Sequence, residues 1–124
     1  MTKHVLLIED EPSIIEAISF ILSRDGLLAE THSDGTTANE KLRAKQPDLV
    51  ILDVMLPGKS GYDILRELRD DPVTADLAVL MLTARGQTRD REMAERAGVS
   101  AFMSKPFSNA EMLDTVRALV QGSA

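Results

Sequence analysis

The sequence predicts an α/β protein in which a parallel sheet is covered by helices on both faces. Two observations lead to this fold class: short aliphatic runs recur along the chain, and segments with the period of an amphipathic helix alternate with them. Such runs between helices are typical of buried parallel strands, and short right-handed crossovers place the helices on both faces. The five strands are expected at Val5–Ile8, Leu27–Thr31, Leu49–Leu52, Ala78–Leu82 and Ala101–Met103.

A helix is expected after each strand, because apolar residues there recur at helical spacing. Pro12 suits a first helical turn, and Gly26 and Gly98 suit the positions just after a helix. Asn109 is expected to cap the last helix, and Thr36–Lys45 is the weakest helical segment, with few apolar positions. The other stripes are Ile14, Ile15, Ile18, Ile21 and Leu22; Ile64, Leu65 and Leu68; Met93, Ala94 and Ala97; and Met112, Leu113, Val116, Leu119 and Val120.

The size and charge of the chain narrow the classes of protein to consider. It has 124 residues and a mass of 13.6 kDa, so we expect residues 1–124 to form one domain. A net charge of −6 argues against direct binding to nucleic acid or to an anionic membrane. There is no cysteine, which excludes disulfides and thiolate metal sites. No apolar stretch approaches the roughly 20 residues that span a bilayer, and we expect a cytoplasmic protein.

Acidic residues follow two of the predicted strands. Asp53 ends the run at Leu49–Leu52, and Glu9, Asp10 and Glu11 follow the run at Val5–Ile8. In open α/β sheets the chemistry lies beyond the carboxyl ends of the strands, so these carboxylates are expected to meet. Clustered carboxylates repel one another unless a cation neutralises them, and hard oxygen ligands of this kind suit Mg²⁺. The sequence therefore predicts an acidic magnesium pocket.

Four motifs at strand ends together resemble the receiver domain of bacterial two-component response regulators, the CheY-like superfamily. The resemblance covers essentially the whole chain and is strongest to the OmpR/PhoB type. It implies a flavodoxin-like sheet of order 2-1-3-4-5 that is phosphorylated on an aspartate by a histidine kinase. The motifs are Glu9-Asp10, Asp53-Val54-Met55-Leu56-Pro57-Gly58, Leu82-Thr83-Ala84 and Lys105-Pro106-Phe107.

The resemblance implies a role for each acidic residue. Asp53 corresponds to the phospho-acceptor, whose carboxylate forms an acyl phosphate. Asp10 and Asp53 correspond to direct Mg²⁺ ligands, Met55 to a ligand through its backbone carbonyl, and Glu9 to a ligand through a bound water. In isolation, Asp53 could simply cap the turn after its strand, and Glu9 and Asp10 could serve only the dipole of the following helix. Glu11 is assigned to solvent and to the start of the helix.

Three further residues are implied in the response to phosphorylation. Thr83 and Lys105 correspond to the hydroxyl and the ammonium that contact phosphoryl oxygens, and receivers generally have a cis bond between that lysine and the following proline, here Pro106. Phe102 corresponds to a switch aromatic that moves inward when the hydroxyl is drawn to the phosphate. Each also has a purely structural interpretation. Thr83 could be an ordinary β-branched strand residue, Lys105 a solvated loop charge and Phe102 a static core aromatic.

Two loop positions, Met55 and Arg85, correspond to sites that adjust how fast water removes the phosphoryl group. Arg85 could equally be a surface charge.

Two alternative functions are disfavoured by the residues that follow the first and third strands. A Mg²⁺-dependent phosphatase usually needs an acid–base aspartate two residues after the nucleophile, where this chain has Met55. A nucleotide-binding module needs a Gly-rich phosphate loop after the first strand. This chain has Glu9–Pro12 there, and these acidic residues would repel phosphate. We therefore expect a phospho-acceptor, possessing no separate enzymatic activity.

The expected partners follow from the same resemblance. They are a sensor histidine kinase or phosphotransfer protein and a downstream effector protein or domain, which the surface of the fourth helix, fifth strand and fifth helix would control. Relatives of the OmpR/PhoB type dimerise through interlocked charges on that surface. Here Ser100-Ala101 replaces paired aspartates and Thr115 replaces a basic residue, while Arg91 and Glu111 could still form one pair. We expect a monomer when the chain is unphosphorylated.

Overall fold

The computed structural model describes residues 2–84 and 88–121. Five parallel strands and five α-helices alternate along these residues, with one short 3₁₀ helix, η1, before α2. The strands are β1 (His4–Ile8), β2 (Leu28–His32), β3 (Leu49–Asp53), β4 (Ala78–Thr83) and β5 (Ala101–Ser104). The helices are α1 (Pro12–Arg24), η1 (Gly35–Thr37), α2 (Ala38–Lys45), α3 (Gly61–Asp70), α4 (Thr88–Arg96) and α5 (Asn109–Gln121).

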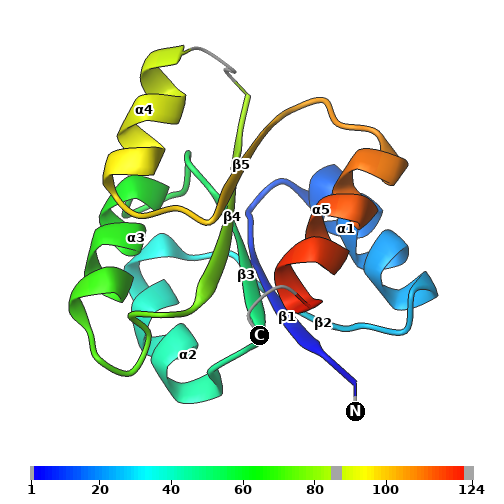
Figure 1. Ribbon diagram of the computed structural model, residues 1–124, viewed down its shortest axis with the longest axis horizontal. Coiled ribbons are helices and arrows are strands. Elements are labelled where there is room, and N and C mark those ends of the chain that lie inside the picture. Colours follow the sequence, from blue (N-terminus) through cyan, green and yellow to red (C-terminus); the bar gives the residue numbers. More distant parts are fainter. Residues whose placement is uncertain (1, 85–87, 122–124) are drawn as a thin grey trace.

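The strands pair in the order β2-β1-β3-β4-β5, as the resemblance implies. Figure 1 shows the sheet between two helical layers, with α1 and α5 on one face and α2, α3 and α4 on the other. The predicted α/β architecture is therefore confirmed. Strand bounds differ from the expected ones by a residue or two; β2, for example, begins at Leu28 and ends at His32.

Alternating residues of the central strands fill two separate cores. On β1, Val5 and Leu7 pack with α1 and α5, whereas Leu6 and Ile8 pack with α2, α3 and α4. This is the two-residue period of a strand whose two faces are both covered. All five residues of β3 are buried, which makes β3 a rigid support for the aspartate at its end.

The signals for helix ends are confirmed with one correction. Pro12 is the first residue of α1, and Gly26 and Gly98 have positive φ angles of 80° and 93° just after α1 and α4. The prediction that Asn109 caps α5 is wrong, because Asn109 is already the first helical residue. Ser108 is the cap: its Oγ accepts a hydrogen bond at 3.0 Å from the backbone N–H of Glu111, which would otherwise lack a partner inside the helix.

The predicted helix Thr36–Lys45 is divided in the structure. Residues Gly35–Thr37 form η1, and α2 begins only at Ala38. Asp34 starts this segment, since its Oδ1 accepts a hydrogen bond at 2.9 Å from the N–H of Thr36. Only Ala38 and Leu42 of α2 are buried, which agrees with the weak apolar pattern.

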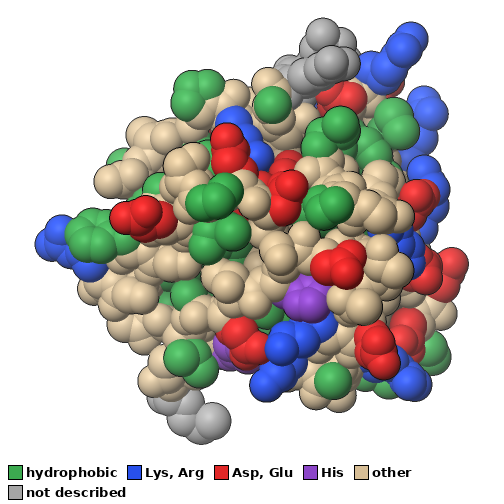
Figure 2. Space-filling model, turned by 180° about the vertical axis from the view of Figure 1, so that it is seen from behind, with side chains coloured by type: hydrophobic (Ala, Val, Ile, Leu, Met, Phe, Trp, Pro, Cys, Tyr) green, Lys and Arg blue, Asp and Glu red, His purple; other side chains and the backbone are tan. Residues whose placement is uncertain are grey.

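Two surface properties bear on function. Figure 2 shows acidic and basic side chains interspersed over the face behind that of Figure 1, so the net negative charge forms no broad acidic patch there. Across residues 2–84 and 88–121, no helix has the length and apolar character needed to cross a bilayer.

The sheet gathers the functional loops at one edge. Because all five strands are parallel, β1, β3, β4 and β5 end together at the top of Figure 1. Asp53 lies beside Leu82 in the β3–β4 pairing, and Thr83 lies beside Ser104 in the β4–β5 pairing. The register therefore brings all four predicted motifs to the same edge.

Candidate functional site

Three carboxylates meet beyond the ends of β1 and β3. Glu9, Asp10 and Asp53 each offer an oxygen, and these oxygens all lie within 4.8 Å of one another. Glu9 and Asp53 are buried, whereas Asp10 is exposed. An oxygen cluster that is anchored inside and open to solvent on one side suits a hard divalent cation that keeps some of its water.

Glu9 is the most enclosed member of the cluster, with no solvent-accessible surface. Its Oε1 accepts hydrogen bonds from the backbone N–H groups of Asp10 at 3.1 Å and Glu11 at 3.2 Å. Burial, and then the neighbouring carboxyl of Asp53, raise the pKa of Glu9, while Lys105 acts in the opposite direction. Glu9 is thus a buried acid held in place by the start of the β1–α1 connection, and not only a charge near a helix end.

Lys105 supplies the cation of the cluster from the end of β5. Its Nζ lies 3.1 Å from Oε2 of Glu9 and 3.5 Å from Oδ1 of Asp53. Burial by itself would lower the pKa of Lys105, but the two carboxylates outweigh it and raise the pKa. The Lys105–Pro106 peptide bond is cis, as expected. Because its Nζ contacts both carboxylates, Lys105 belongs to the cluster and is not a solvated loop charge.

Asp53 lies at the floor of the cluster. It is 4% exposed, and its Oδ1 accepts a hydrogen bond at 3.3 Å from the backbone N–H of Met55. This contact is the turn-capping role considered from the sequence, and it coexists with the contact to Lys105. The side chain of Met55 points outward and is 74% exposed, so its thioether takes no part in the cluster.

Thr83 and Phe102 lie on the neighbouring strands. Thr83 is buried at the end of β4, and its carbonyl accepts a hydrogen bond at 2.7 Å from the N–H of Lys105. Phe102 is half-buried on β5 and packs against the core on the side of α4, with Arg91 over its ring. The structure thus places the predicted switch aromatic on β5, opposite Met81 of β4 and outside the group of carboxylates. Arg85 lies outside the described residues.

Two glycines that the sequence analysis did not single out shape the loop after β3. A Cβ on Gly61 would lie 2.4 Å from the carbonyl oxygen of Asp53, so only glycine allows α3 to start so close to the acidic residue. A Cβ on Gly35 would lie 2.5 Å from the carbonyl oxygen of Lys59, and the N–H of Gly35 donates to the carbonyl of Pro57 at 3.2 Å. The sequence signal was a glycine eight residues after Asp53, but only the packing explains it.

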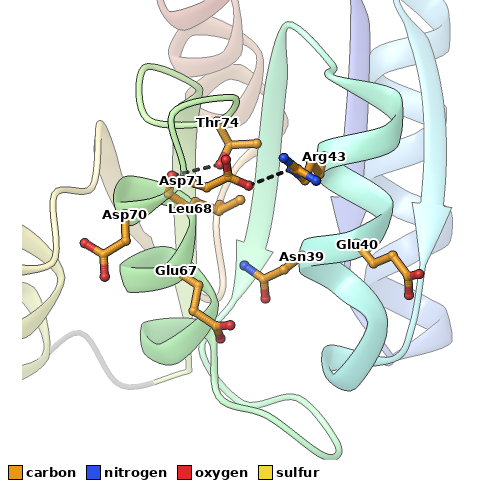
Figure 3. A pocket seen from close by; sticks show the side chains of 8 residues that line it. All are labelled: Asn39, Glu40, Arg43, Glu67, Leu68, Asp70, Asp71 and Thr74. Atoms are coloured by element: carbon orange, nitrogen blue, oxygen red, sulfur yellow. Dashed lines mark hydrogen bonds and ion pairs between the residues drawn. The ribbon is translucent and has the colours of Figure 1, made fainter.

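A separate pocket lies between two of the helices. Figure 3 shows a pocket of about 430 Å³ between α2 and α3, which shares no residue with the carboxylate cluster. Across it Nε of Arg43 pairs with Oδ2 of Asp71 at 3.0 Å, and the hydroxyl of Thr74 donates to the carbonyl of Leu68 at 2.8 Å. The basic residue that lines this pocket, Arg43, is therefore already paired with a carboxylate, and the candidate site remains at the strand ends.

Comparison with protein families identifies the family to which the chain belongs. The family described as "Response regulator receiver domain" matches residues 5–117. This chain belongs to the receiver family. Receiver domains of two-component response regulators are phospho-acceptors, and they interact with histidine kinases and effector domains. The resemblance stated from the sequence is confirmed.

The receiver domain is similar to several transcriptional regulators of the OmpR/PhoB type. It is 36% identical over 121 residues to the phosphate regulon transcriptional regulatory protein PhoB of Escherichia coli, covering 98% of this chain and 53% of that protein. It is 39% identical over 118 residues to the DNA-binding dual master transcriptional regulator RpaA of Synechocystis, covering 95% and 49%. The chain therefore spans about half the length of these relatives.

Solved structures share the whole receiver fold. A putative response regulator from Chloroflexus aurantiacus superposes with a TM-score of 0.93 at 28% identity, covering 98% of this chain and 99% of that one. The receiver domain of the sensor histidine kinase PA1611 from Pseudomonas aeruginosa superposes with a TM-score of 0.89 at 27% identity, with the same coverage. The latter structure has a magnesium ion coordinated in its active-site cleft.

Proposed function

We propose that this receiver domain accepts a phosphoryl group on Asp53 from a sensor histidine kinase or phosphotransfer protein in a Mg²⁺-dependent step. The modified state then alters the α4–β5–α5 surface, through which the domain controls an effector protein or domain. One observation carries the proposal: the buried Asp53 lies in a cluster with two more carboxylates and with the ammonium of Lys105.

The donor set fits magnesium. Three carboxylates face one ammonium, so negative charge remains in excess where a phosphoryl anion must enter. Asp10 and Asp53 would hold the ion directly, together with the backbone carbonyl of Met55, and Glu9 would hold it through water. A magnesium ion bound there neutralises the repulsion between Asp53 and the entering group.

The protein residues divide the remaining tasks. A carboxylate oxygen of Asp53 forms the bond to phosphorus while the phosphorus–nitrogen bond of the phosphohistidine breaks, and its electron pair stays on the imidazole nitrogen. Lys105 leaves its contact with the carboxylates and pairs with a phosphoryl oxygen. The hydroxyl of Thr83 donates a hydrogen bond to another phosphoryl oxygen, and this displacement of Thr83 makes room for the ring of Phe102. Met55 and Arg85 correspond in the sequence to family positions that adjust hydrolysis, and we assign them that role.

A hydrolytic enzyme is disfavoured by the residue two positions after Asp53. A phosphatase using this aspartate needs a proton donor there, and the side chain of Met55 is an exposed thioether that cannot transfer a proton. The same domain acting in a phosphorelay needs no such group, because the phosphohistidine has a good leaving group. A cytoplasmic location belongs to this proposal, since response regulators are typically cytoplasmic.

We also propose that the unphosphorylated chain is a monomer. The α4–β5–α5 surface lacks the paired aspartates and the basic residue that would interlock two copies, having Ser100, Ala101 and Thr115 at those positions. One remaining exposed pair contributes about 0–1 kcal/mol, too little to hold a dimer at micromolar concentration. Sedimentation with and without beryllofluoride tests this; a tight symmetric dimer of the untreated protein would contradict it.

The central experiment is phosphorylation by acetyl phosphate with Mg²⁺, followed by intact mass and peptide mapping. One phosphoryl group should appear on Asp53, and Asp53→Asn should remove it. Asp48→Asn is a suitable control, because Asp48 caps the start of β1 at the other end of the sheet and accepts a hydrogen bond from the N–H of His4. Incorporation at the wild-type rate in Asp53→Asn would refute the assignment. EDTA should suppress the reaction in the wild-type protein.

A further inference from the structure

Arg91 connects α4 to the aromatic residue of β5. Its guanidinium carbon lies 5.2 Å from the centre of the Phe102 ring, within the range in which a cation is attracted to the negative face of an aromatic ring. Arg91 is exposed and Phe102 is half-buried, so the contact lies at the surface. An aromatic ring that must move inward would have to leave this contact.

Other contacts, which do not involve Phe102, hold α4 in place. The hydroxyl of Tyr62 on α3 donates to the carbonyl of Asp90 at 3.3 Å, and Nε of Arg69 donates to the carbonyl of Gly98 at 2.8 Å just after α4. Ala94 is buried in the core between them. Because these contacts attach the helix to α3, loss of the Arg91 side chain is not expected to detach α4. Its effect is expected on the ring.

We propose that Arg91 is a positioning residue whose cation–π contact holds Phe102 in its half-buried position in the unphosphorylated domain. We call this Arg91–Phe102 contact the latch. Inward movement of the ring then frees the guanidinium on the α4 surface, so one event both repacks β5 and presents a new cation to a partner. The direction of this change rests on the proposed function of Asp53, Thr83 and Phe102. The contact itself does not depend on it.

The size of the effect follows from the exposure of the contact. An exposed cation–π pair corresponds to a factor of about two to five in an equilibrium constant. Such a latch biases the switch without preventing it. Removing the cation should shift the resting population toward the inward ring, and by linkage a phosphoryl mimic that favours this state should bind more tightly. Arg91→Met should therefore raise the apparent affinity for beryllofluoride in Mg²⁺ about two- to fivefold.

The ring can be observed directly by fluorine NMR after incorporation of 4-fluorophenylalanine. The chain has three phenylalanines, Phe20, Phe102 and Phe107, so three resonances are expected. Phe20 is an internal reference with its own cation, since the guanidinium carbon of Arg24 lies 5.6 Å from its ring centre. Without any phosphoryl mimic, Arg91→Met should move the Phe102 resonance and leave that of Phe20, whereas Arg24→Met should do the reverse.

Two further variants separate the cation from the helix. Arg91→Lys keeps the charge and should retain most of the wild-type resonance position and beryllofluoride affinity. Arg89→Met removes an exposed arginine from the same helix and should change neither. Equal effects of Arg89→Met and Arg91→Met would show that only the charge of α4 matters, and this would overturn the latch.

The outcomes for the latch and for the proposed function are distinct. A Phe102 resonance that does not move in Arg91→Met overturns the latch, whether or not Asp53 accepts a phosphoryl group. A resonance that moves while beryllofluoride affinity stays at the wild-type value overturns the coupling between latch and site. If the wild-type protein takes up neither a phosphoryl group nor beryllofluoride, the proposed function is refuted. If Arg91→Met still moves the Phe102 resonance in that case, the Arg91–Phe102 contact remains supported.

Discussion

The ammonium group of Lys105 donates a hydrogen bond at 3.1 Å to the fully buried carboxylate of Glu9, although 96 residues separate them in the chain. This pair joins the ends of β1 and β5 across the strands between them. It also keeps the ammonium of Lys105 3.5 Å from a carboxylate oxygen of Asp53 when no metal ion is bound. The pair therefore connects the stability of the fold with the chemistry of the site.

Lys105→Ala should destabilise the metal-free protein, because it leaves the buried carboxylate of Glu9 without its cation. The expected cost is about 1–3 kcal/mol in the free energy of unfolding, measured with urea in EDTA. Lys41→Ala is the matched control: it removes a pair with Glu30 at 2.9 Å in which both side chains are about one-third exposed, and it should cost at most about 1 kcal/mol. Equal losses in the two variants would contradict the structural role of Lys105.

Asp10→Asn should weaken Mg²⁺ binding by about tenfold or more, because it removes the charge of the exposed carboxylate in the cluster. Calorimetric titration with MgCl₂ measures the change directly. Glu11→Gln is the control, since Glu11 is adjacent and exposed but its carboxylate is outside the cluster. Unchanged Mg²⁺ affinity in Asp10→Asn would remove Asp10 from the set of ligands.

Thr83→Ala should separate phosphorylation from the response. The variant should still take a phosphoryl group on Asp53, because the hydroxyl contacts the transferred group and does not attack it. It should give smaller chemical-shift changes than wild type around Phe102, since nothing draws residue 83 toward the phosphate. Thr83→Ser keeps the hydroxyl and should restore the response. Identical spectra of phosphorylated Thr83→Ala and wild type would show that Thr83 and Phe102 are not coupled.

Tyr62 should make the fold lose stability at high pH. Burial, and then the nearby charge of Asp90, raise the pKa of Tyr62 above its ordinary value of 10.0. The folded state therefore keeps the phenolic proton when the unfolded chain has lost it, so this contribution is present below pH 10 and disappears as the pH rises through the raised pKa. Tyr62 is the one tyrosine in a chain without tryptophan, so ultraviolet absorbance reports its titration alone.

Tyr62→Phe supplies the control for the alkaline measurement. The variant should lose the part of the pH dependence that comes from the phenol, while keeping the ring buried between α3 and α4. Ionisation of Tyr62 in the folded protein at or below the pH found for a denatured sample would contradict the buried environment.

Gly61→Ala should disturb Asp53 without touching its side chain. The added methyl would lie 2.4 Å from the carbonyl oxygen of Asp53, so the start of α3 or the end of β3 must shift. We expect a loss of about 1–3 kcal/mol in unfolding free energy and slower phosphorylation. Ala75→Gly on the α3–β4 connection is a comparison for a glycine–alanine change away from the site. A Gly61→Ala protein with wild-type stability and rate would show that the loop yields freely.

The local patterns of the sequence were sufficient for the elements and for the edge of the sheet that carries the site. Aliphatic runs and helical stripes depend only on neighbours within a few residues, so they predicted the alternating order and the carboxylates after β1 and β3. The four motifs identified the family. Where such local signals were weak or shared by neighbouring residues, as at Asn109 and Ser108 or at the start of α2, the predicted ends were displaced.

Contacts between distant parts of the chain were decided only by the tertiary structure. The complete burial of Glu9, its pairing with Lys105, the approach of Gly61 to Asp53 and the position of Arg91 over Phe102 all depend on which elements the sheet places side by side. A strand pattern shows that a residue faces inward but not which residue of another strand or helix it meets. The sequence by itself determined the chemistry available at the strand ends, and the packing determined which of those groups act on one another.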